Sequence, residues 1–331
     1  MSLSRGLVAP AILDRILILI VTHHDDLHAL AIRRELSSRA SLPCHIVECD
    51  RVAQREALSI FLSRSDRSGH CRTADGAWID IGAQKVLWLR RPRAEQVLAR
   101  ELPDETAQDV VENDCAGAFR GLLSSTFRGK WISSYEGLSR GSDKIGQLFA
   151  AAQSGWRVPE TVVTQSKPEV LALLERHREA GIVVKTVVGT SGAFLLTTPV
   201  RNPSAIAASA FQAAPAIYQE KIAGSRHIRL LCFGEHSLAA SIDTEDLDWR
   251  PNLNVPVSAW AVPEAIHRKV RLTLDVLGLE MGVVDLKETP DGELVWLEVN
   301  PQGQFLFLEP LTDLKLAARF SDYLVQAAAV V

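Results

Sequence analysis

The spacing of apolar residues predicts alternating strands and helices in the first part of the chain. Apolar runs at residues 15–21, 44–49 and 86–89 have the length and composition of short buried strands. Between the first two runs, residues 25–37 repeat apolar positions as an amphipathic helix does. Strands that alternate with helices predict a small parallel sheet.

The middle and end of the chain continue the alternation with less regular lengths. Further segments are predicted as strands at residues 161–163, 182–186, 216–222 and 228–233, and as helices at 168–178 and 314–328. Another helix is predicted to begin after Ser142-Asp143, with the apolar positions Ile145, Leu148, Phe149 and Ala152, and to end at Gly155.

A hairpin near the end of the chain carries polar residues on apolar strands. Residues 283–287 and 294–299 are predicted as its strands, joined by a turn at Asp291-Gly292. Asp285 and Glu298 can face the same side, and Asn300 follows two residues later on that face. Such hard oxygen ligands suit Mg²⁺. An acidic strand end in solvent is the alternative, but buried carboxylates need partners or a metal.

A second polar feature is Lys185, at the end of a predicted strand and just before the stretch Gly189-Thr190-Ser191-Gly192. A lysine beside a glycine-rich turn can neutralise phosphate while the backbone N–H groups of the turn bind its oxygens. Because the lysine precedes the glycines, the pattern differs from a P-loop. A plain hairpin remains the alternative interpretation.

Composition limits the classes of function. With 331 residues, 47% hydrophobic residues and a formal net charge of -4, the chain has room for two or three domains and no basic footprint. Nucleic acid is therefore not expected as a partner. The apolar run at residues 16–21 is too short to span a bilayer, so neither a membrane partner nor a location outside the cytoplasm is expected. Five cysteines without a C-x-x-C pair suit a reducing compartment.

The segment Thr22-His23-His24-Asp25-Asp26-Leu27-His28 contains three histidines, two of them four residues apart. A second metal site would be one interpretation. We favour a structural one, in which Asp25 and Asp26 complement a helix N-terminus and the histidines line a crevice above a parallel strand.

The block from Trp296 to Glu309, behind the upstream Asp285, resembles the terminal metal-binding signature of the ATP-grasp ligases. It is most similar to the branch that matures ribosomal peptides, the microviridin-type graspetide synthetases. The resemblance runs from Lys144 to Glu309. The preceding Arg90-Arg91-Pro92 looks like part of the pre-ATP-grasp domain of such enzymes.

The resemblance implies an α/β chain, with an ATP-grasp fold behind an N-terminal pre-ATP-grasp parallel-sheet domain. The expected domains are a pre-ATP-grasp βα domain (residues 1–125), a central lobe with the nucleotide lysines (126–212) and a C-terminal lobe with the hinge and metal residues (213–331).

The resemblance also implies roles for individual residues. The expected metal ligands are Asp285, Glu298 and Asn300. The expected catalytic cations are Arg229 and Arg250, the latter within an Asp-Trp-Arg segment that recurs in the graspetide branch. The expected nucleotide contacts are Lys144, Lys185, Gly189, Thr190, Ser191, Gly192, Gln219, Glu220, Ile222 and His227. His227 stands where family members usually carry an aspartate near the ribose, so tight ribose anchoring is in doubt.

The activity implied is ATP-dependent carboxylate activation through an acyl phosphate, with ATP and two Mg²⁺ ions. The leading hypothesis is a macrocyclase that joins side chains of a precursor peptide with a leader segment, acting as a homodimer. Two alternatives are a ligase that adds an amino acid such as glutamate to a peptide or protein terminus, and an ATP-binding module with impaired chemistry.

Overall fold

The computed structural model describes residues 17–40, 43–54, 56–92, 95–189, 195–252 and 254–330. The chain forms two compact units. The first combines the part of the chain before Tyr135 with the part from Lys315 onward, and the second spans Tyr135–Leu314.

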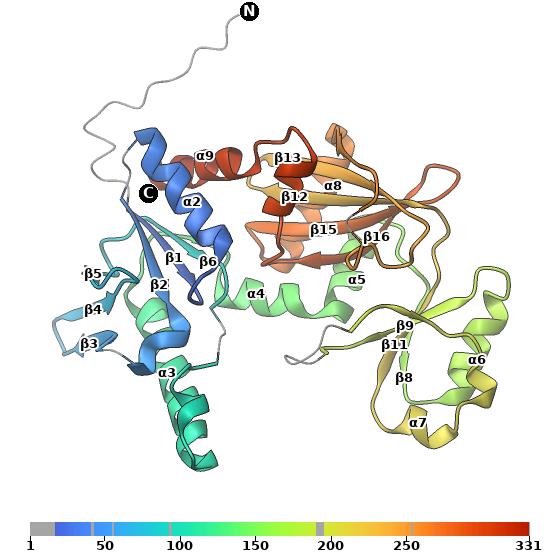
Figure 1. Cartoon of the computed structure of the whole chain (residues 1–331), viewed down its shortest axis with the longest axis horizontal. Helices are drawn as coiled ribbons and strands as arrows, with labels where there is room; N and C mark the ends of the chain where they lie inside the picture. The colour runs from blue at the N-terminus through green and yellow to red at the C-terminus, as the bar shows by residue number, and fades with distance from the viewer. Residues whose placement is uncertain are drawn as a thin grey trace, which may run out of the picture. The chain divides into compact units, whose positions relative to one another are not determined.

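A four-stranded parallel sheet forms the core of the first unit, as the alternating pattern predicts. Its strands are β1 (Ile18–Thr22), β2 (Cys44–Glu48), β6 (Val86–Leu89) and β7 (Lys130–Ile132), in the order β2-β1-β6-β7. Helix α2 (Leu27–Ala40) packs against the chain's last helix, α9 (Leu316–Ala329), which also contacts β6 (Figure 1). The rings of Trp88 and Phe320 meet edge to face at 4.8 Å, so the end of the chain completes the first unit.

The start of α2 confirms the structural interpretation of the acidic pair for Asp26. Its carboxylate accepts hydrogen bonds from the Thr22 hydroxyl at 2.6 Å and from the His28 backbone N–H at 2.9 Å. Burial alone would raise the pKa of Asp26, but Arg90, 3.6 Å away, and these hydrogen bonds hold it below its usual value. Asp26 therefore acts as an anionic cap, whereas Asp25 is exposed.

Several elements of the first unit, including β7, are absent from the sequence prediction. A small antiparallel sheet consists of β3 (Leu58–Leu62), β4 (Arg67–Arg72) and β5 (Trp78–Asp80), and it packs on α3 (Glu105–Thr126). Gly69 permits this packing, because a Cβ there would lie 2.5 Å from Leu122. Helix α3 buries only residues near its C-terminal end, so its apolar periodicity is too short to stand out.

The second unit contains two antiparallel sheets, of which the smaller has the order β10-β9-β11-β8. Its strands are β8 (Thr161–Thr164), β9 (Ile182–Thr186), β10 (Thr198–Pro199) and β11 (Ala216–Glu220). Helix α6 (Lys167–Arg176) and α7 (Ala208–Gln212) lie beside this sheet (Figure 1). They enclose a compact cluster made of Val170, Leu173, Ile182, Phe211 and Tyr218.

The larger sheet has the order β14-β13-β12-β15-β16 and carries the hairpin. Its strands are β12 (Arg226–Phe233), β13 (His236–Asp243), β14 (Val257–Trp260), β15 (Met281–Glu288) and β16 (Leu294–Asn300). Helices α4 (Tyr135–Ser142), α5 (Lys144–Gln153) and α8 (Glu264–Leu277) pack on its strands. Short 3₁₀ helices occur at Cys49–Gln54, Ala99–Glu101, Pro203–Ala205 and Leu306–Leu311.

Helix α5 begins and ends where predicted, with Asp143 as its N-cap, but it buries a different face. The predicted apolar face includes Phe149, which is 68% exposed. The buried positions are instead Gln147, Ala150 and Ala151. The expected face was wrong because a glutamine with a specific backbone partner occupies the buried side, as described below.

Along the described residues, no helix has the length and apolar character needed to cross a membrane.

Candidate functional site

The polar residues of the larger sheet lie on one of its faces. Strand pairing places Arg229 opposite Asp285, and Asp285 opposite Glu298. His227 lies opposite Lys287, and Asn300 opposite Val283. Directly paired residues share a face, and so do residues two apart in a regular strand. The three expected metal ligands therefore share one face, together with Arg229, His227 and Lys287.

A β-bulge sets this arrangement, and the sequence prediction did not include it. Asp285 pairs with Glu298 but Leu286 pairs with Trp296, so Leu297 is the extra residue in β16. Regular alternation would put Trp296 and Glu298 on the same face. The bulge turns Glu298 toward Asp285 and leaves Trp296 fully buried on the other side.

Asp285 and Arg229 form a buried ion pair at the centre of the face, with Arg229 Nη1 donating to Asp285 Oδ2 at 2.6 Å. Arg229 Nη2 also donates to the Gln304 carbonyl at 2.9 Å, and the guanidinium lies 5.4 Å from the Trp249 ring centroid. Burial raises the pKa of Asp285 and neighbouring Glu298 adds to this, while Arg229 opposes both.

A cation fits this pair of carboxylates. Asp285 Oδ1 is buried and has no hydrogen-bond partner among the described residues. Such an atom is costly unless a donor or metal meets it. Within the same described part of the chain, no three His, Cys, Asp or Glu side chains form a metal cluster. The expected site has only two carboxylates, completed by the Asn300 amide oxygen, and that donor set is suited to Mg²⁺ with water and phosphate ligands.

Gln147 fixes the strand that carries Glu298 and Asn300, and sequence reasoning missed it. Its side-chain Nε2 donates to the Val299 carbonyl at 2.8 Å, and its Oε1 accepts from the Val299 N–H at 2.9 Å. Strand β16 is at the edge of the sheet, so these backbone groups have no further strand to pair with. No local sequence signal marks it, because its partner is 152 positions away along the chain.

Two lysines approach the polar face from other elements. Lys144, the first residue of α5, donates from Nζ to the Thr186 carbonyl at the end of β9 at 2.9 Å. Lys185 lies on β9, and its pKa is lowered because burial removes water from the ammonium. Glu298 opposes this effect, and Lys144 and Arg250 reinforce it. These residues therefore form one electrostatic group.

Arg250 is held by its own neighbour in the Asp-Trp-Arg segment. Its Nε donates to Asp248 Oδ1 at 2.7 Å, and its Nη2 contacts Asp248 Oδ2. Hydrogen bonding to Asp248 raises the pKa of Arg250, burial lowers it, and the charges of Glu298 and Asp285 raise it further. Arg250 is thus a fixed cation in the same electrostatic group.

A cavity opens between the two sheets of the second unit. It is lined by Pro159, Val183, Lys185, Thr197, Gln219, Glu220, Lys221, Ile222, Leu247, Lys287 and Leu297. The structure therefore brings together Lys185 and the three residues expected at the hinge. The bulged Leu297 contributes to the apolar part of the wall.

The hinge residues are held by side chains of the smaller sheet and its flanks. Gln219 donates from Nε2 to the Thr161 hydroxyl at 3.0 Å, and Glu220 accepts from Arg157 at 2.9 Å. Arg157 also bonds Glu293 in the hairpin at 2.9 Å. Arg157, which was not predicted, thus ties the hinge to the hairpin.

His227 does not behave as an exposed ribose ligand would. The ring is buried, and its Nε2 lies 3.3 Å from the Nζ atom of Lys287. Burial lowers the pKa of His227 to about 4, and Lys287 adds to the effect. The imidazole is therefore neutral at physiological pH and accepts a hydrogen bond from Lys287.

The structure describes only the first residue of the glycine-rich stretch. Thr190, Ser191 and Gly192 lie outside the described residues. Gly189 is described and has a φ of +94°, a conformation that favours glycine.

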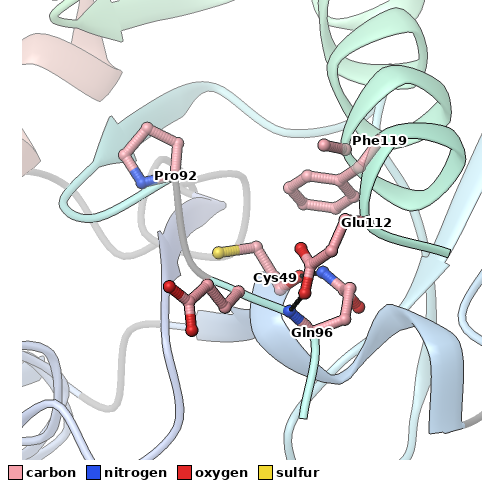
Figure 2. Close-up of a pocket in the computed structure, with 7 residues that line it drawn as sticks. Cys49, Pro92, Gln96, Glu112 and Phe119 are labelled. Atoms are coloured by element: carbon pink, nitrogen blue, oxygen red, sulfur yellow. Dashed lines mark hydrogen bonds between the residues drawn. The ribbon is translucent and has the colours of Figure 1, made fainter. Parts of the chain in front are cut away.

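The first unit has a separate cavity, which Figure 2 shows, lined by Cys49, Pro92, Glu95, Gln96, Glu112, Ala116 and Phe119. Its polar groups are engaged within the unit. The Gln96 backbone N–H donates to Glu112 at 2.5 Å, the Gln96 side chain donates to the Cys49 carbonyl at 2.7 Å, and Glu95 pairs with Arg100. No residue expected to act in catalysis lines it.

The chain is similar over nearly its whole length to solved ATP-grasp ligases. It matches the macrocyclase MdnC bound with precursor peptide MdnA from Microcystis aeruginosa with a TM-score of 0.81 and 22% identity, covering 94% of this chain and 99% of that one. It matches a Chryseobacterium gregarium RiPP-associated ATP-grasp ligase in complex with ADP and a leader and core peptide with a TM-score of 0.82 and 21% identity, covering 95% and 97%. For the ATP-grasp ligase PsnB complexed with a precursor variant, Mg and ADP, the TM-score is 0.77 and the identity 20%, covering 95% and 99%.

Relatives identified by sequence similarity are named as ligases of a different kind. A probable alpha-L-glutamate ligase of Maridesulfovibrio salexigens is 29% identical over 199 residues, which cover 58% of this chain and 65% of the relative. One from Sodalis glossinidius is 30% identical over 187 residues, covering 54% and 63%. The chain thus spans less than two thirds of the length of these relatives. No family model matches the chain.

The structural matches show the ATP-grasp fold, and the fold class predicted from the sequence is confirmed.

Proposed function

We propose that this chain is an ATP-dependent carboxylate ligase, acting as a macrocyclase on a ribosomal precursor peptide. The observation that carries the ligase proposal is the polar face, where a buried Asp285–Arg229 pair lies opposite Glu298 and within the electrostatic reach of Lys185. Carboxylates for a metal and cations for phosphate, beside a cavity with an apolar wall, match the needs of phosphoryl transfer.

The reaction has two steps. An oxygen of the substrate carboxylate forms a bond to the γ-phosphorus of ATP, the bond from that phosphorus to the bridging oxygen breaks, and ADP leaves with the electron pair. An amine or hydroxyl then attacks the acyl carbon, the bond to the phosphate oxygen breaks, and phosphate leaves while the attacking group loses a proton. The net result is one amide or ester per ATP.

The protein's own residues position and neutralise charge in this scheme. Lys144 and Lys185 bind phosphate oxygens, Arg229 stabilises the transferring phosphoryl group, and Arg250 binds the substrate carboxylate. The hinge at Gln219, Glu220 and Ile222 receives the base. Asp285, Glu298 and Asn300 would hold two Mg²⁺ ions, which supply neutralisation of the triphosphate charge when bound.

A peptide substrate is supported by the structural neighbours. The matches that cover 94–95% of this chain include ligases bound to precursor, leader and core peptides. We therefore propose a precursor peptide with a leader segment as the partner of this chain, and a cytoplasmic homodimer as its working form.

Addition of glutamate to a peptide or protein terminus is the second candidate. The observation that favours it is the identity of 28–30% to probable glutamate ligases. That similarity is confined to 54–59% of this chain, whereas the similarity to peptide macrocyclases includes the first unit.

Mass spectrometry separates the two candidates. The enzyme, ATP, Mg²⁺ and a peptide encoded beside its gene are incubated together. Each condensation within the peptide removes about 18 Da, whereas each added glutamate contributes about 129 Da, as follows from the carboxylate-activation chemistry. A ladder of water losses is expected, and a ladder of glutamate additions would overturn the macrocyclase proposal.

The third candidate, an ATP-binding module with impaired chemistry, is tested in the same reaction. We expect ADP and phosphate to form in proportion to the crosslinks. Nucleotide binding with no ADP formation in the presence of the peptide would favour this module. We consider it because His227 stands where the resemblance leads us to expect an aspartate.

A further inference from the structure

We propose that Lys287 is a nucleotide-binding residue of this chain, whose ammonium donates to an oxygen of the bound nucleotide while His227, 3.3 Å away, holds it in the cavity. This inference rests on the proposed function, because it assigns a further contact within the same nucleotide site.

The position of Lys287 carries the inference. The residue lies on β15, two residues beyond Asp285 and on the same face, and it lines the cavity that contains Lys185 and the hinge. Its side chain is buried, with 5% of the residue exposed. The side chain therefore forms part of the cavity wall and is shielded from bulk solvent.

The buried ammonium of Lys287 has no anion in direct contact among the described residues. Across the described residues, Lys287 forms no ion pair within 4.0 Å, and its hydrogen bond goes to the uncharged His227 ring. The charge of Lys221 repels this ammonium, and that of Glu245 attracts it. A buried ammonium without an anionic partner is destabilising unless a ligand supplies the acceptor.

His227 has the right chemistry to position this ammonium. A neutral imidazole can accept one hydrogen bond through Nε2 and leaves the remaining donors of Lys287 available. An aspartate at this position would form an ion pair with Lys287 and reduce its need for a ligand. His227 stands where the resemblance leads us to expect an aspartate, and Lys287 is paired directly with it in the sheet. The two residues therefore act together.

The rest of the cavity wall identifies the class of ligand. Val183, Ile222, Leu247 and Leu297 provide apolar surface of the kind that receives a base, and Lys185 provides a second ammonium. A ligand with an aromatic base and electronegative oxygens satisfies both. The oxygen that Lys287 meets can belong to a ribose hydroxyl or to a phosphate.

Replacement of Lys287 should raise the stability of the unliganded protein and lower its affinity for the nucleotide. Lys287→Met removes the buried ammonium while keeping much of the apolar stem, so the unliganded protein should melt at a higher temperature than wild type. The same change should reduce the increase in melting temperature that ADP and Mg²⁺ produce. A purely structural lysine would not give this combination.

The experiment measures ADP and adenosine binding by calorimetry, together with thermal melting with and without ADP, in wild type, Lys287→Met and Lys167→Met. The control removes a half-buried lysine on α6 that does not line the cavity and whose ammonium donates to the backbone carbonyls of Ser204 and Ile206. We expect ADP to bind Lys287→Met about tenfold more weakly than wild type, as loss of one charge-assisted hydrogen bond implies, and the control to stay within about twofold.

The adenosine measurements identify the oxygen. An equal loss of adenosine and ADP binding in Lys287→Met means a ribose contact, and a loss for ADP alone means a phosphate contact; both support the inference. Unchanged ADP binding in Lys287→Met, or an equal loss in Lys167→Met, would overturn it. If wild type itself fails to bind ADP with Mg²⁺, the proposed function fails instead, so the two failures are distinguishable.

Discussion

At the scale of single residues, Glu298 is the side chain on which the proposed chemistry depends most. It faces Asp285 across the hairpin and contributes to the charge around Lys185 and Arg250. We expect Glu298→Ala to reduce peptide-dependent ADP release by at least about a hundredfold, the usual effect of removing a preorganised electrostatic group.

The matched control for Glu298→Ala is Glu288→Gln, at the outer end of β15, where the carboxylate pairs with Arg226. Circular dichroism and thermal melting should show both variants folded. Near-normal ADP release from Glu298→Ala would contradict the assignment of Glu298 as a metal ligand.

Arg229 has a structural effect that can be measured apart from catalysis. Arg229→Met leaves the Asp285 carboxylate buried without its partner, and breaking a buried pair in this way costs about 3–5 kcal/mol. The free energy of unfolding, from urea titration, should fall by that amount. A second change, Asp285→Asn, should restore part of the loss, and independent, additive effects would contradict direct coupling.

The residues that sequence analysis could identify are those whose type and order carry a signature. Asp285, Glu298 and Asn300 could be proposed as metal ligands because their types and order resemble a known metal-binding signature. Gln147 and Lys287 were not, because their importance comes from partners 152 and 60 positions away along the chain. Burial of a polar side chain depends on tertiary packing, which local patterns do not encode.

At the scale of elements, the edge strand β16 depends on helix α5. Gln147→Leu would remove both hydrogen bonds to the Val299 backbone and leave these buried groups unpaired, at a cost of about 2–4 kcal/mol. Because Val299 lies between Glu298 and Asn300, we also expect weaker Mg²⁺-dependent stabilisation. Thermal melting with and without Mg²⁺-ADP measures both effects.

Gln153→Leu, at the exposed end of the same helix, is the control for Gln147→Leu. It should leave stability within about 0.5 kcal/mol, as expected for a surface change. Loss of stability with unchanged nucleotide response in Gln147→Leu would mean that α5 supports the fold and not the site.

The limits of prediction at this scale follow from geometry. The hairpin was predicted with its turn, but the bulge at Leu297 was not, since inserting one residue into a strand leaves no trace in composition. The buried face of α5 was assigned wrongly because its apolar residues do not mark it. Strands β3, β4, β5 and β10 and helix α3 were not predicted, because their apolar patterns are short or weak.

At the scale of the whole molecule, described segments from early and late in the chain pack together in the first unit. Helix α9 was predicted as the final element, and the structure shows that it packs on α2 and β6. Such a contact between segments almost 300 residues apart has no local signal. The expected boundaries of the three domains, at residues 125 and 212, remain predictions, as do the homodimer and the cytoplasmic location.

Each unit contains one buried histidine that should make it sensitive to acid. Burial lowers the pKa of His28, in the first unit, to about 4, with Arg90 adding to the effect, and burial also lowers that of His227, in the second, to about 4. A lowered pKa means that the folded state binds fewer protons than the unfolded state. The stabilising contribution is complete above about pH 6.5 and is lost as the pH falls toward 4. From shifts of this size, each histidine should account for a loss of about 3 kcal/mol.

Substitution of each histidine should protect only its own unit. Pulsed hydrogen exchange during urea unfolding, read peptide by peptide at pH 7 and pH 4.5, reports on the two units separately. His28→Gln should flatten the pH dependence of peptides from β1, β2 and α2, and His227→Gln that of peptides from β12 and β15. Each variant is compared with wild type at the same pH, so other titrating groups cancel. If either substitution changed both units equally, the units would unfold as one cooperative body, and the assignment of acid sensitivity to separate buried histidines would be wrong.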